Sequence, residues 1–393
     1  MAPLAACILC VLGCGQVPAQ TRLDPSEPRS QKVIAALESE WSKTEKRTIP
    51  CRITPYPPRL GFELRLWSGY EIGIPIDAIP ETETALNMLA LIRVQPKQSG
   101  LRPEYLVRTY DLPELPASQG MRRKLELSFG GGFFLGAGKY RVDLLLIAAD
   151  GRSCTKSWDL KAGSGSVKIE QPPNTVASAA SDEWKGFREK KSSEPSRVTV
   201  LVHAAPVVRR RHAVKLSPWD REILLDTLIA LLDRSRFTSA RVTAFDLESR
   251  RVLFDTEEFT PRAYRRLQRA LAQADLATVP YSTLKDGPTP AEFLLDLVRS
   301  SNARTDDTVV FVGPAWRPTS GGKPQMRIQE LANRPNAYQI ALLPFFTPPA
   351  GAVNEFVRWF GGRVLSVYKP SDLASAIAAI DKHGSRSIST QLK

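Results

Sequence analysis

The pattern of hydrophobic and polar positions changes twice along the chain. Between residues 49 and 160, apolar residues alternate with polar ones or form short runs, most clearly at 60–66 and 139–147. An Asp150-Gly151 pair after the second run is typical of a tight hairpin turn, and frequent prolines exclude long helices. This pattern predicts an antiparallel β-sandwich of immunoglobulin-like size over residues 49–160.

A glycine triplet, Gly130-Gly131-Gly132, interrupts this region. A phosphate-binding loop needs a strand before it and a helix N-terminus after it, whereas an apolar segment and a further strand follow here. We therefore predict a hairpin loop at the triplet.

From residue 198 onward, apolar strands alternate with capped helices. Residues 198–202, 308–312 and 363–367 are apolar runs, and Ser217-Pro218 and Thr289-Pro290 are typical helix starts. Such alternation favours a mostly parallel sheet with helices on both faces. The expected fold class is thus multidomain, with an N-terminal antiparallel β-sandwich and a C-terminal α/β doubly wound domain over residues 198–383.

The remaining segments are polar or resemble a leader. We predict a polar tether or short helix at 20–48, a disordered linker at 161–197, where Gly, Ser, Pro and charged residues dominate, and a flexible tail at 384–393. Residues 1–19 contain an apolar run and end in Val17-Pro18-Ala19, which predicts a signal peptide cleaved after Ala19. The alternative is a lipoprotein signal with a lipid anchor at Cys14. Either leader places the protein outside the cytoplasm, in the periplasm or secreted.

Cysteine usage agrees with export. Three of the five cysteines fall inside the leader, so Cys51 and Cys154 are the only two of the mature chain. Two thiols in an oxidising compartment predict one disulfide that joins the two ends of the sandwich region. The alternative is two separately buried thiols.

The order of elements over residues 197–383 resembles a von Willebrand factor type A domain, as does the segment 362–373, where a last strand leads through a polar turn into a final helix. The resemblance covers about half of the chain. It implies a divalent cation bound by five oxygen ligands. In this sequence the first three ligand positions fall on His203, Ala205 and Val207, the fourth on Thr289 and the fifth on Gly313. Only the threonine supplies oxygen, and it is also explained as a helix cap. We therefore predict no metal and no cofactor.

Catalytic motifs are absent from the sequence. The chain has no Gly-x-Ser-x-Gly, no His-Glu-x-x-His and no phosphate loop, and it contains only three histidines. We expect a protein that is not an enzyme, with His203 a partly buried residue at a strand end. The alternative is a hydrolase with a site near His203 at the sheet edge.

The net charge of +13 favours contact with anionic surfaces, and the alternative is a generally basic, solvated surface. Arg209, Arg210 and Arg211 follow the first strand of the second domain, and Trp316-Arg317 follow a later one. Because ligands dock at the carboxyl ends of parallel strands, these residues could form a binding edge with His203 and Thr289. The alternative is an ordinary solvated loop. The expected function is binding or scaffolding of a protein partner, for which an acidic protein would fit the charge, with no nucleic acid and no membrane-spanning segment.

Overall fold

The computed structural model describes most of the chain in two compact units. The described residues are 20–43, 48–79, 87–111, 125–163, 167–169, 171–179, 184–187, 196–208, 215–276, 281–285, 287–301, 307–315, 335–344 and 348–390, with positions 165 and 279. The first unit comprises Met1–Gly61 and Arg65–Asp182, and the second comprises Phe62–Leu64 and Glu183–Lys393. Among the described residues, no helix combines the length and the hydropathy needed to cross a membrane.

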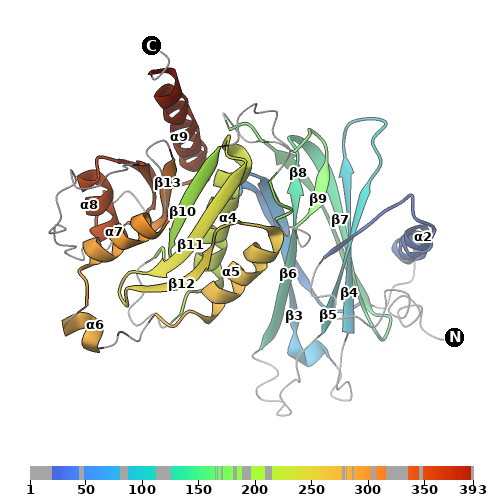
Figure 1. Ribbon diagram of the computed structural model, residues 1–393. Helices are drawn as coiled ribbons and strands as arrows, with labels where there is room; N and C mark the ends of the chain where they lie inside the picture. Colours follow the sequence, from blue (N-terminus) through green and yellow to red (C-terminus); the bar gives the residue numbers. More distant parts are fainter. Residues whose placement is uncertain are drawn as a thin grey trace. The chain divides into compact units, whose positions relative to one another are not determined.

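Two antiparallel sheets form the first unit (Figure 1). The five-stranded sheet has the order β1-β5-β4-β7-β8, formed by Thr21–Leu23, Glu104–Asp111, Asn87–Pro96, Gly138–Ala148 and Ser153–Ala162. The four-stranded sheet has the order β2-β3-β6-β9, formed by Arg52–Leu60, Leu66–Pro75, Glu126–Leu135 and Val176–Ser178. A 3-10 turn, η1 (Ile76–Ala78), follows β3. The hairpin predicted at Asp150-Gly151 is confirmed, since β7 and β8 pair antiparallel on either side of it.

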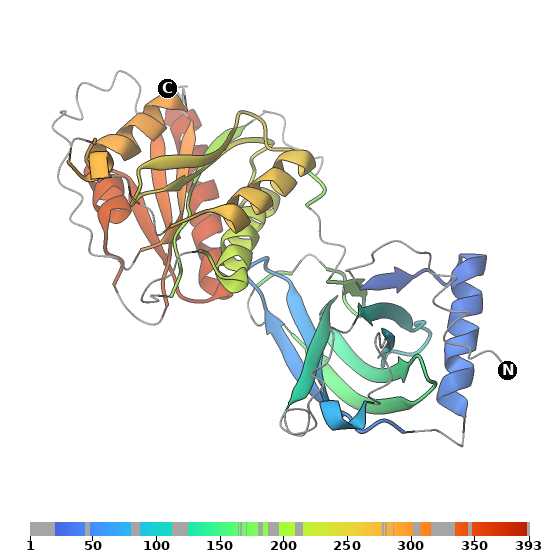
Figure 2. The ribbon, with the colours of Figure 1, turned by 90° about the horizontal axis from the view of Figure 1, so that it is seen from below.

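One hydrophobic core lies between these two sheets. It combines side chains such as Ile72 and Phe133 of the four-stranded sheet with Ile92 and Leu144 of the five-stranded sheet. The opposite face of the five-stranded sheet is covered by helix α2 (Pro28–Ser42), as Figure 2 shows. The apolar residues Val33 and Leu37 of α2 pack there against Leu145. The segment 20–48, predicted as a tether or short helix, is therefore part of the first unit.

The glycine triplet is not a loop. Gly130, Gly131 and Gly132 lie inside β6 and pair with Glu71, Tyr70 and Gly69 of β3. A Cβ atom at position 131 would lie 2.7 Å from Cζ of Tyr70, which is closer than packed atoms approach. The prediction of a hairpin loop is wrong because these glycines make room for aromatic side chains on a strand, and local sequence does not reveal that need.

The predicted disulfide is present. Cys51, directly before β2, is bonded to Cys154 in β8, with 6.4 Å between their Cα atoms. The bond joins the start of β2 in the four-stranded sheet to β8 in the five-stranded sheet. Beside it, the backbone N–H of Ile49 donates to the carbonyl of Ser153 at 3.1 Å.

A six-stranded sheet forms the second unit. Its order is β12-β11-β10-β13-β14-β15, formed by Arg251–Thr256, Ser239–Asp246, Arg197–His203, Thr308–Pro314, Asn336–Leu342 and Arg363–Val367. Neighbouring strands pair parallel except for β11 and β12, which form an antiparallel hairpin.

Helices pack on both faces of this sheet. α4 (Pro218–Arg234), α5 (Pro261–Gln273) and α9 (Pro370–Thr390) share one core with the sheet. α7 (Pro290–Ser300) and α8 (Ala352–Trp359) share another core on the opposite face. A short helix, α6 (Tyr281–Lys285), precedes α7.

The predicted fold class needs correction. Among the described residues, strands account for 40% and helices for 29% in three sheets, which is a β-rich fold and not one with a C-terminal α/β doubly wound domain. The prediction rested on the alternation of strands and helices after residue 198, a pattern that does not weigh strand against helix. The antiparallel β11–β12 hairpin and the nine strands of the first unit shift that balance toward strand.

Two boundary predictions also differ from the structure. β9 and the buried Trp184 lie within residues 161–197, which were predicted as a linker. Their few apolar residues are diluted by the Gly, Ser and Pro around them, so average composition hides them. At the other end, α9 continues to Thr390 into the predicted flexible tail.

Candidate functional site

The carboxyl ends of β10 and β13 meet where the predicted site lies. Val202 pairs with Val312, so the next residues, His203 and Gly313, are neighbours. A Cβ atom at Gly313 would lie 2.8 Å from Cβ and 2.9 Å from the carbonyl oxygen of His203. The strand order changes direction between these two strands, a place where parallel sheets often bind ligands. The structure thus brings two of the predicted positions together.

His203 is a packed side chain. It is 8% exposed, and its ring stacks on Phe245 with 5.3 Å between ring centroids and 11° between planes. Phe245 in turn meets Phe293 of α7 edge-on at 6.1 Å. The backbone N–H of Ala204 donates to the carbonyl of Phe245 at 2.8 Å. Aromatic packing therefore holds the imidazole at this edge.

Thr289 is a helix cap, as its sequence context indicated. Its Oγ1 accepts from the backbone N–H of Glu292 at 3.2 Å, and its own N–H donates to the Glu292 carboxylate at 2.7 Å. The carbonyl of Thr289 also accepts from the backbone N–H of Phe293 at 3.0 Å. Thr289 is thereby linked to His203 through two aromatic rings, with its side chain engaged in a capping box.

A buried carboxylate anchors the loop after β10. Asp220, 1% exposed in the first turn of α4, accepts from the backbone N–H of Val207 at 3.0 Å. Its other oxygen accepts from the Ser217 hydroxyl at 2.5 Å and from the Ser217 N–H at 3.1 Å. Ala205 and Val207 are buried as a result. The sequence predicted the cap at Ser217 but not the bond from Asp220 to the loop, which joins residues far apart in the chain.

Several predicted site residues lie outside the described residues: Arg209, Arg210, Arg211, Trp316 and Arg317. Cys14 lies outside them as well. In the part of the chain that the structure describes, no three His, Cys, Asp or Glu side chains are grouped where they could hold a metal ion. The absence of a metal and of a cofactor therefore stays a prediction.

The structure reveals a basic helix face that the prediction of the binding edge did not include. Arg262, Arg265, Arg266 and Arg269 of α5 are all exposed, while Ala263, Tyr264, Leu267 and Leu271 of the same helix are buried. The guanidinium of Arg266 lies 5.7 Å from the ring centroid of Phe254 in β12. The sequence held the signal, because arginines at i, i+3, i+4 and i+7 of a predicted helix share one face.

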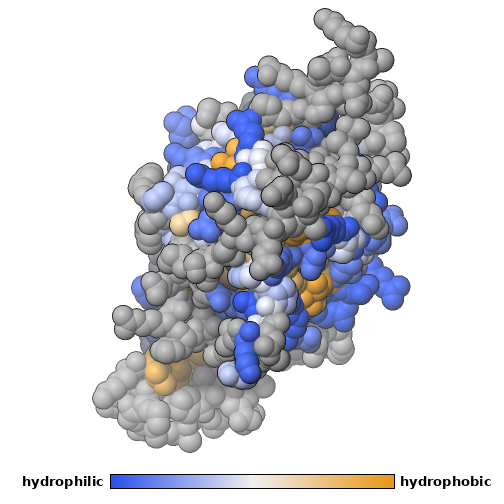
Figure 3. Space-filling model, turned by 60° about the vertical axis from the view of Figure 1, so that its left-hand side comes forward, coloured by the Kyte–Doolittle hydropathy of each residue, from blue (hydrophilic) through white to orange (hydrophobic). Residues whose placement is uncertain are grey.

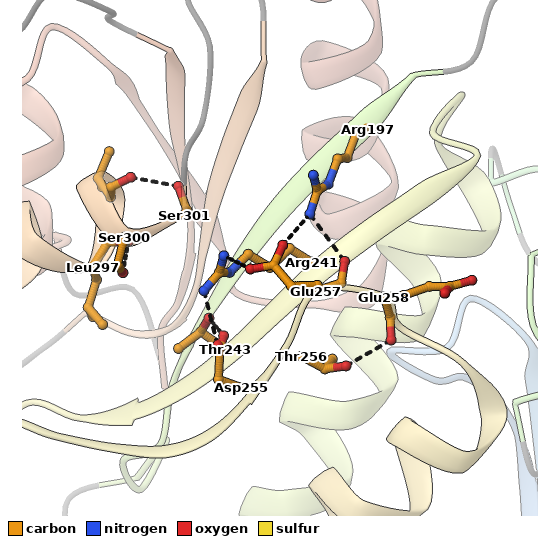
Figure 4. A network of polar contacts seen from close by, with 11 residues as sticks. Arg197, Arg241, Thr243, Asp255, Thr256, Glu257, Glu258, Leu297, Ser300 and Ser301 are labelled. Carbon is orange, nitrogen blue, oxygen red and sulfur yellow. Dashed lines mark hydrogen bonds and ion pairs between the residues drawn. The ribbon is translucent and has the colours of Figure 1, made fainter.

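The acidic side chains of the neighbouring β12 edge are held by other arginines (Figure 4). The side chain of Arg241, 8% exposed, is paired with Asp255 at 3.0 Å and also with Glu257. Glu257 is paired in addition with Arg197 at 2.7 Å, and Asp255 accepts from the Thr243 hydroxyl at 2.6 Å. These pairs join β10, β11 and β12. The carboxylates of Asp255 and Glu257 are thus already engaged within the sheet.

Apolar surface is sparse on the face drawn in Figure 3, where hydrophobic residues show as small areas among hydrophilic ones. Among the described residues, the large apolar side chains that are most exposed are scattered over both units: Tyr56, Leu101, Leu125, Trp219, Val252 and Tyr281. Charge, therefore, is the more distinctive surface property.

No family model and no curated protein matches the chain. Solved structures are similar to a part of it. A superoxide reductase (neelaredoxin) from Archaeoglobus fulgidus is 12% identical, with a TM-score of 0.19, over 30% of this chain and 92% of that chain. A β-glucosidase from Listeria innocua is 12% identical, with a TM-score of 0.18, over 30% of this chain and 16% of that chain. Similarities this weak carry no argument, and the resemblance to a type A domain stays a prediction.

Proposed function

We propose that this chain is an exported, non-catalytic binding protein whose second unit holds an acidic segment of a partner protein on the exposed face of α5. The observation that carries the proposal is the row of four exposed arginines on that face, in a helix that has no acidic residue. Over seven residues the row extends about 10 Å along the helix axis. A partner with carboxylates at similar spacing would meet several guanidinium groups at once.

The chemistry of the face favours a protein partner over a lipid surface. Guanidinium groups bind carboxylates through two parallel hydrogen bonds, which gives both strength and direction. An amphipathic helix that enters a membrane needs apolar side chains at its surface. The apolar side chains of α5 are buried in the core of the second unit, where Tyr264, Leu267 and Leu271 pack. This face therefore offers charge without an apolar anchor.

Export is supported by the leader and by the disulfide. Residues 1–19 have the apolar run and the small residues that a signal peptidase recognises. Disulfides such as Cys51–Cys154 persist in oxidising compartments and are rare in the cytosol.

A binding role suits the sheet edge better than hydrolysis. A hydrolase would need a general base that reaches its substrate. The ring of His203 is instead 8% exposed and stacked against Phe245. At Gly313, the close approach of His203 leaves no room for an acidic side chain.

Direct binding of an acidic peptide tests the proposal. The probe is a fluorescent peptide of alternating Glu and Ala, titrated with the full chain at low salt. The variant carries Arg262→Gln, Arg265→Gln, Arg266→Gln and Arg269→Gln, which keep the helix propensity and remove four charges. Exposed ion pairs contribute about 0.2–1 kcal/mol each, so we expect roughly ten- to hundredfold weaker binding. Added salt should weaken wild-type binding in the same direction.

A matched control removes four exposed charges from the first unit: Arg29→Gln, Lys32→Gln, Lys139→Gln and Lys161→Gln. If affinity follows net charge alone, both variants weaken equally and the proposal fails. Stronger binding to vesicles containing phosphatidylglycerol than to the peptide would also overturn it in favour of a lipid surface.

A further inference from the structure

Gln20 lies where the two sheets of the first unit meet, and it is hydrogen-bonded there. It is 3% exposed, although it lies directly before the first strand of the unit. Its side-chain Oε1 accepts from the backbone N–H of Gly132 in β6 at 3.3 Å. Its carbonyl accepts from the Ser178 hydroxyl in β9 at 2.6 Å. The next residue, Thr21, pairs with Val107 of β5 in the other sheet. Residue 20 is therefore a structural part of this edge of the sandwich.

One atom of this side chain does not fit such a buried place. Among the described residues, Nε2 of Gln20 has no hydrogen-bond partner, although it is shielded from solvent. A buried polar group without a partner destabilises the folded state, because it has given up its hydrogen bonds to water. The nearby Gly131 leaves space for this side chain, since a Cβ atom there would lie 3.1 Å from Oε1 of Gln20.

The proposed cleavage after Ala19 makes Gln20 the first residue of the mature chain. Its α-amine would then be charged at neutral pH on a residue that is 3% exposed. Burying an unpaired charge is unfavourable. Gln20 would thus carry two nitrogen groups whose burial is unfavourable: the charged α-ammonium and the Nε2 amide, which has no hydrogen-bond partner among the described residues.

We propose that Gln20 is cyclised to pyroglutamate in the mature protein, an inference that rests on the proposed export. The neutral α-amine attacks Cδ, and a bond forms between the α-nitrogen and Cδ. The bond between Cδ and Nε2 breaks, and Nε2 leaves as ammonia with a proton from the α-amine. The reaction needs no oxidant, reductant or further reactant.

The contacts of Gln20 match the fate of each atom in this reaction. Nε2, which leaves, is the atom without a partner. Oε1, which stays as the lactam oxygen, is the atom held by the N–H of Gly132. Negative charge develops on that oxygen in the tetrahedral intermediate, so the same N–H stabilises it. The product is a neutral lactam, which has lost Nε2 and in which the α-nitrogen no longer carries a charge.

Mass spectrometry of the full chain, expressed with its own leader and recovered from outside the cytoplasm, tests this inference. We expect an N-terminal peptide that begins at residue 20 and is lighter than the glutamine form by one ammonia. A chain that begins at Gln20 with a free amine would overturn cyclisation and leave export intact. A chain that begins elsewhere, carries lipid at Cys14 or keeps its leader would overturn the cleavage site and the inference with it.

Two variants separate cyclisation from simple blocking of the terminus. After unfolding in urea, Gln20→Glu should begin at residue 20 with an amine that reacts with an acylating reagent, because a carboxylate is a far poorer electrophile than an amide. Gln31→Glu, on the exposed side of α2, makes the same chemical change and should remain unreactive at its N-terminus. Equal N-terminal reactivity of the two variants would contradict the assignment to the Gln20 side chain.

Discussion

Each of the two units is stabilised internally by different interactions. The first unit is cross-linked by Cys51–Cys154, and its strands are all antiparallel. The second unit contains no cysteine in its sequence and depends on capped helices packed on a largely parallel sheet. A disulfide restricts the unfolded chain, whereas caps and packing act on the folded state alone. Perturbations of each kind should therefore affect one unit and spare the other.

A glycine permits a close approach in each unit, but the neighbour differs. Gly131 of the first unit faces the ring of Tyr70, a side chain that substitution can shorten. Gly313 of the second unit faces the Cβ atom and the carbonyl oxygen of His203. Every residue has this carbonyl oxygen, and every residue except glycine has the Cβ atom, so substitution of His203 by alanine removes neither. A clash at position 131 should therefore be relieved by a second substitution, and a clash at position 313 should not.

Removing the disulfide should have the largest effect. In the Cys51→Ser, Cys154→Ser variant, the first unit loses a cross-link between residues 103 apart. Closing a loop of that length stabilises by about 4.7 kcal/mol in the chain-entropy treatment. We expect the thermal transition of the first unit to fall sharply while that of the second unit stays in place. Calorimetry of the full chain measures both, and an equal downward shift of both transitions would show that the units unfold together.

Gly131→Ala should have the next largest effect, again on the first unit. The added methyl would lie 2.7 Å from Cζ of Tyr70, and such overpacking costs about 1–3 kcal/mol. Tyr70→Phe in the same chain removes the phenol oxygen and should recover part of this loss, measured as a coupling free energy in a double-mutant cycle. Gly163→Ala is the control, since a Cβ atom there meets nothing within 4 Å. Strictly additive effects at positions 131 and 70 would refute the proposed clash.

Local signals in the sequence predicted local structure well. The capping boxes at Ser217 and Thr289 and the turn at Asp150-Gly151 are decided by residues within four positions of one another, and the structure contains all three. The alternation at 60–66 was typical of a strand, but this stretch contains the turn between the end of β2 and the start of β3, where Leu64 has a φ of 57°. Period-two alternation over so short a run does not separate a strand from a turn that buries its apolar residues.

Features that depend on distant residues escaped prediction. The glycine triplet belongs to a strand because Tyr70, some sixty residues earlier, needs the space. The bond from Asp220 to the N–H of Val207 depends on where α4 places its first turn. The basic face of α5 was readable from its spacing, yet its exposure depends on which face the core takes. The paired Cys51 and Cys154 were predictable over a long separation because the sequence offered no other partner outside the leader.

Gly313→Ala should destabilise the second unit by a similar amount. The residue has a φ of 156° and lies against the backbone of His203, and strain of this kind costs about 1–3 kcal/mol. His203→Ala should not relieve it, because alanine keeps the Cβ atom and the carbonyl. Urea unfolding of the single and double variants tests this expectation. Recovery of stability in the double variant would show that the imidazole, and not the backbone, excludes a side chain at position 313.

The smallest effect is expected at high pH, where the first unit should weaken through Tyr105. Its hydroxyl donates to Oε1 of Glu38 at 2.5 Å and so helps to hold α2 on the five-stranded sheet. Burial, together with this bond to a carboxylate, raises the pKa of Tyr105 to about 12. In the unfolded chain a tyrosine loses its proton near pH 10. The folded state therefore keeps a proton that the unfolded state has lost, and the stability from neutral Tyr105 is complete below about pH 10 and lost by about pH 12.

Tyr105→Phe removes this dependence and leaves that of the other buried tyrosines, Tyr70, Tyr110 and Tyr140, whose pKa values burial also raises. The unfolding free energy of the first unit should thus fall more steeply with pH in the wild type than in the variant between about pH 10 and 12. Tyr281→Phe, at a residue 76% exposed in the second unit, is the control and should follow the wild type. If the Tyr105→Phe and wild-type curves run parallel across this range, the hydroxyl of Tyr105 ionises equally in both states, and the bond to Glu38 does not anchor α2.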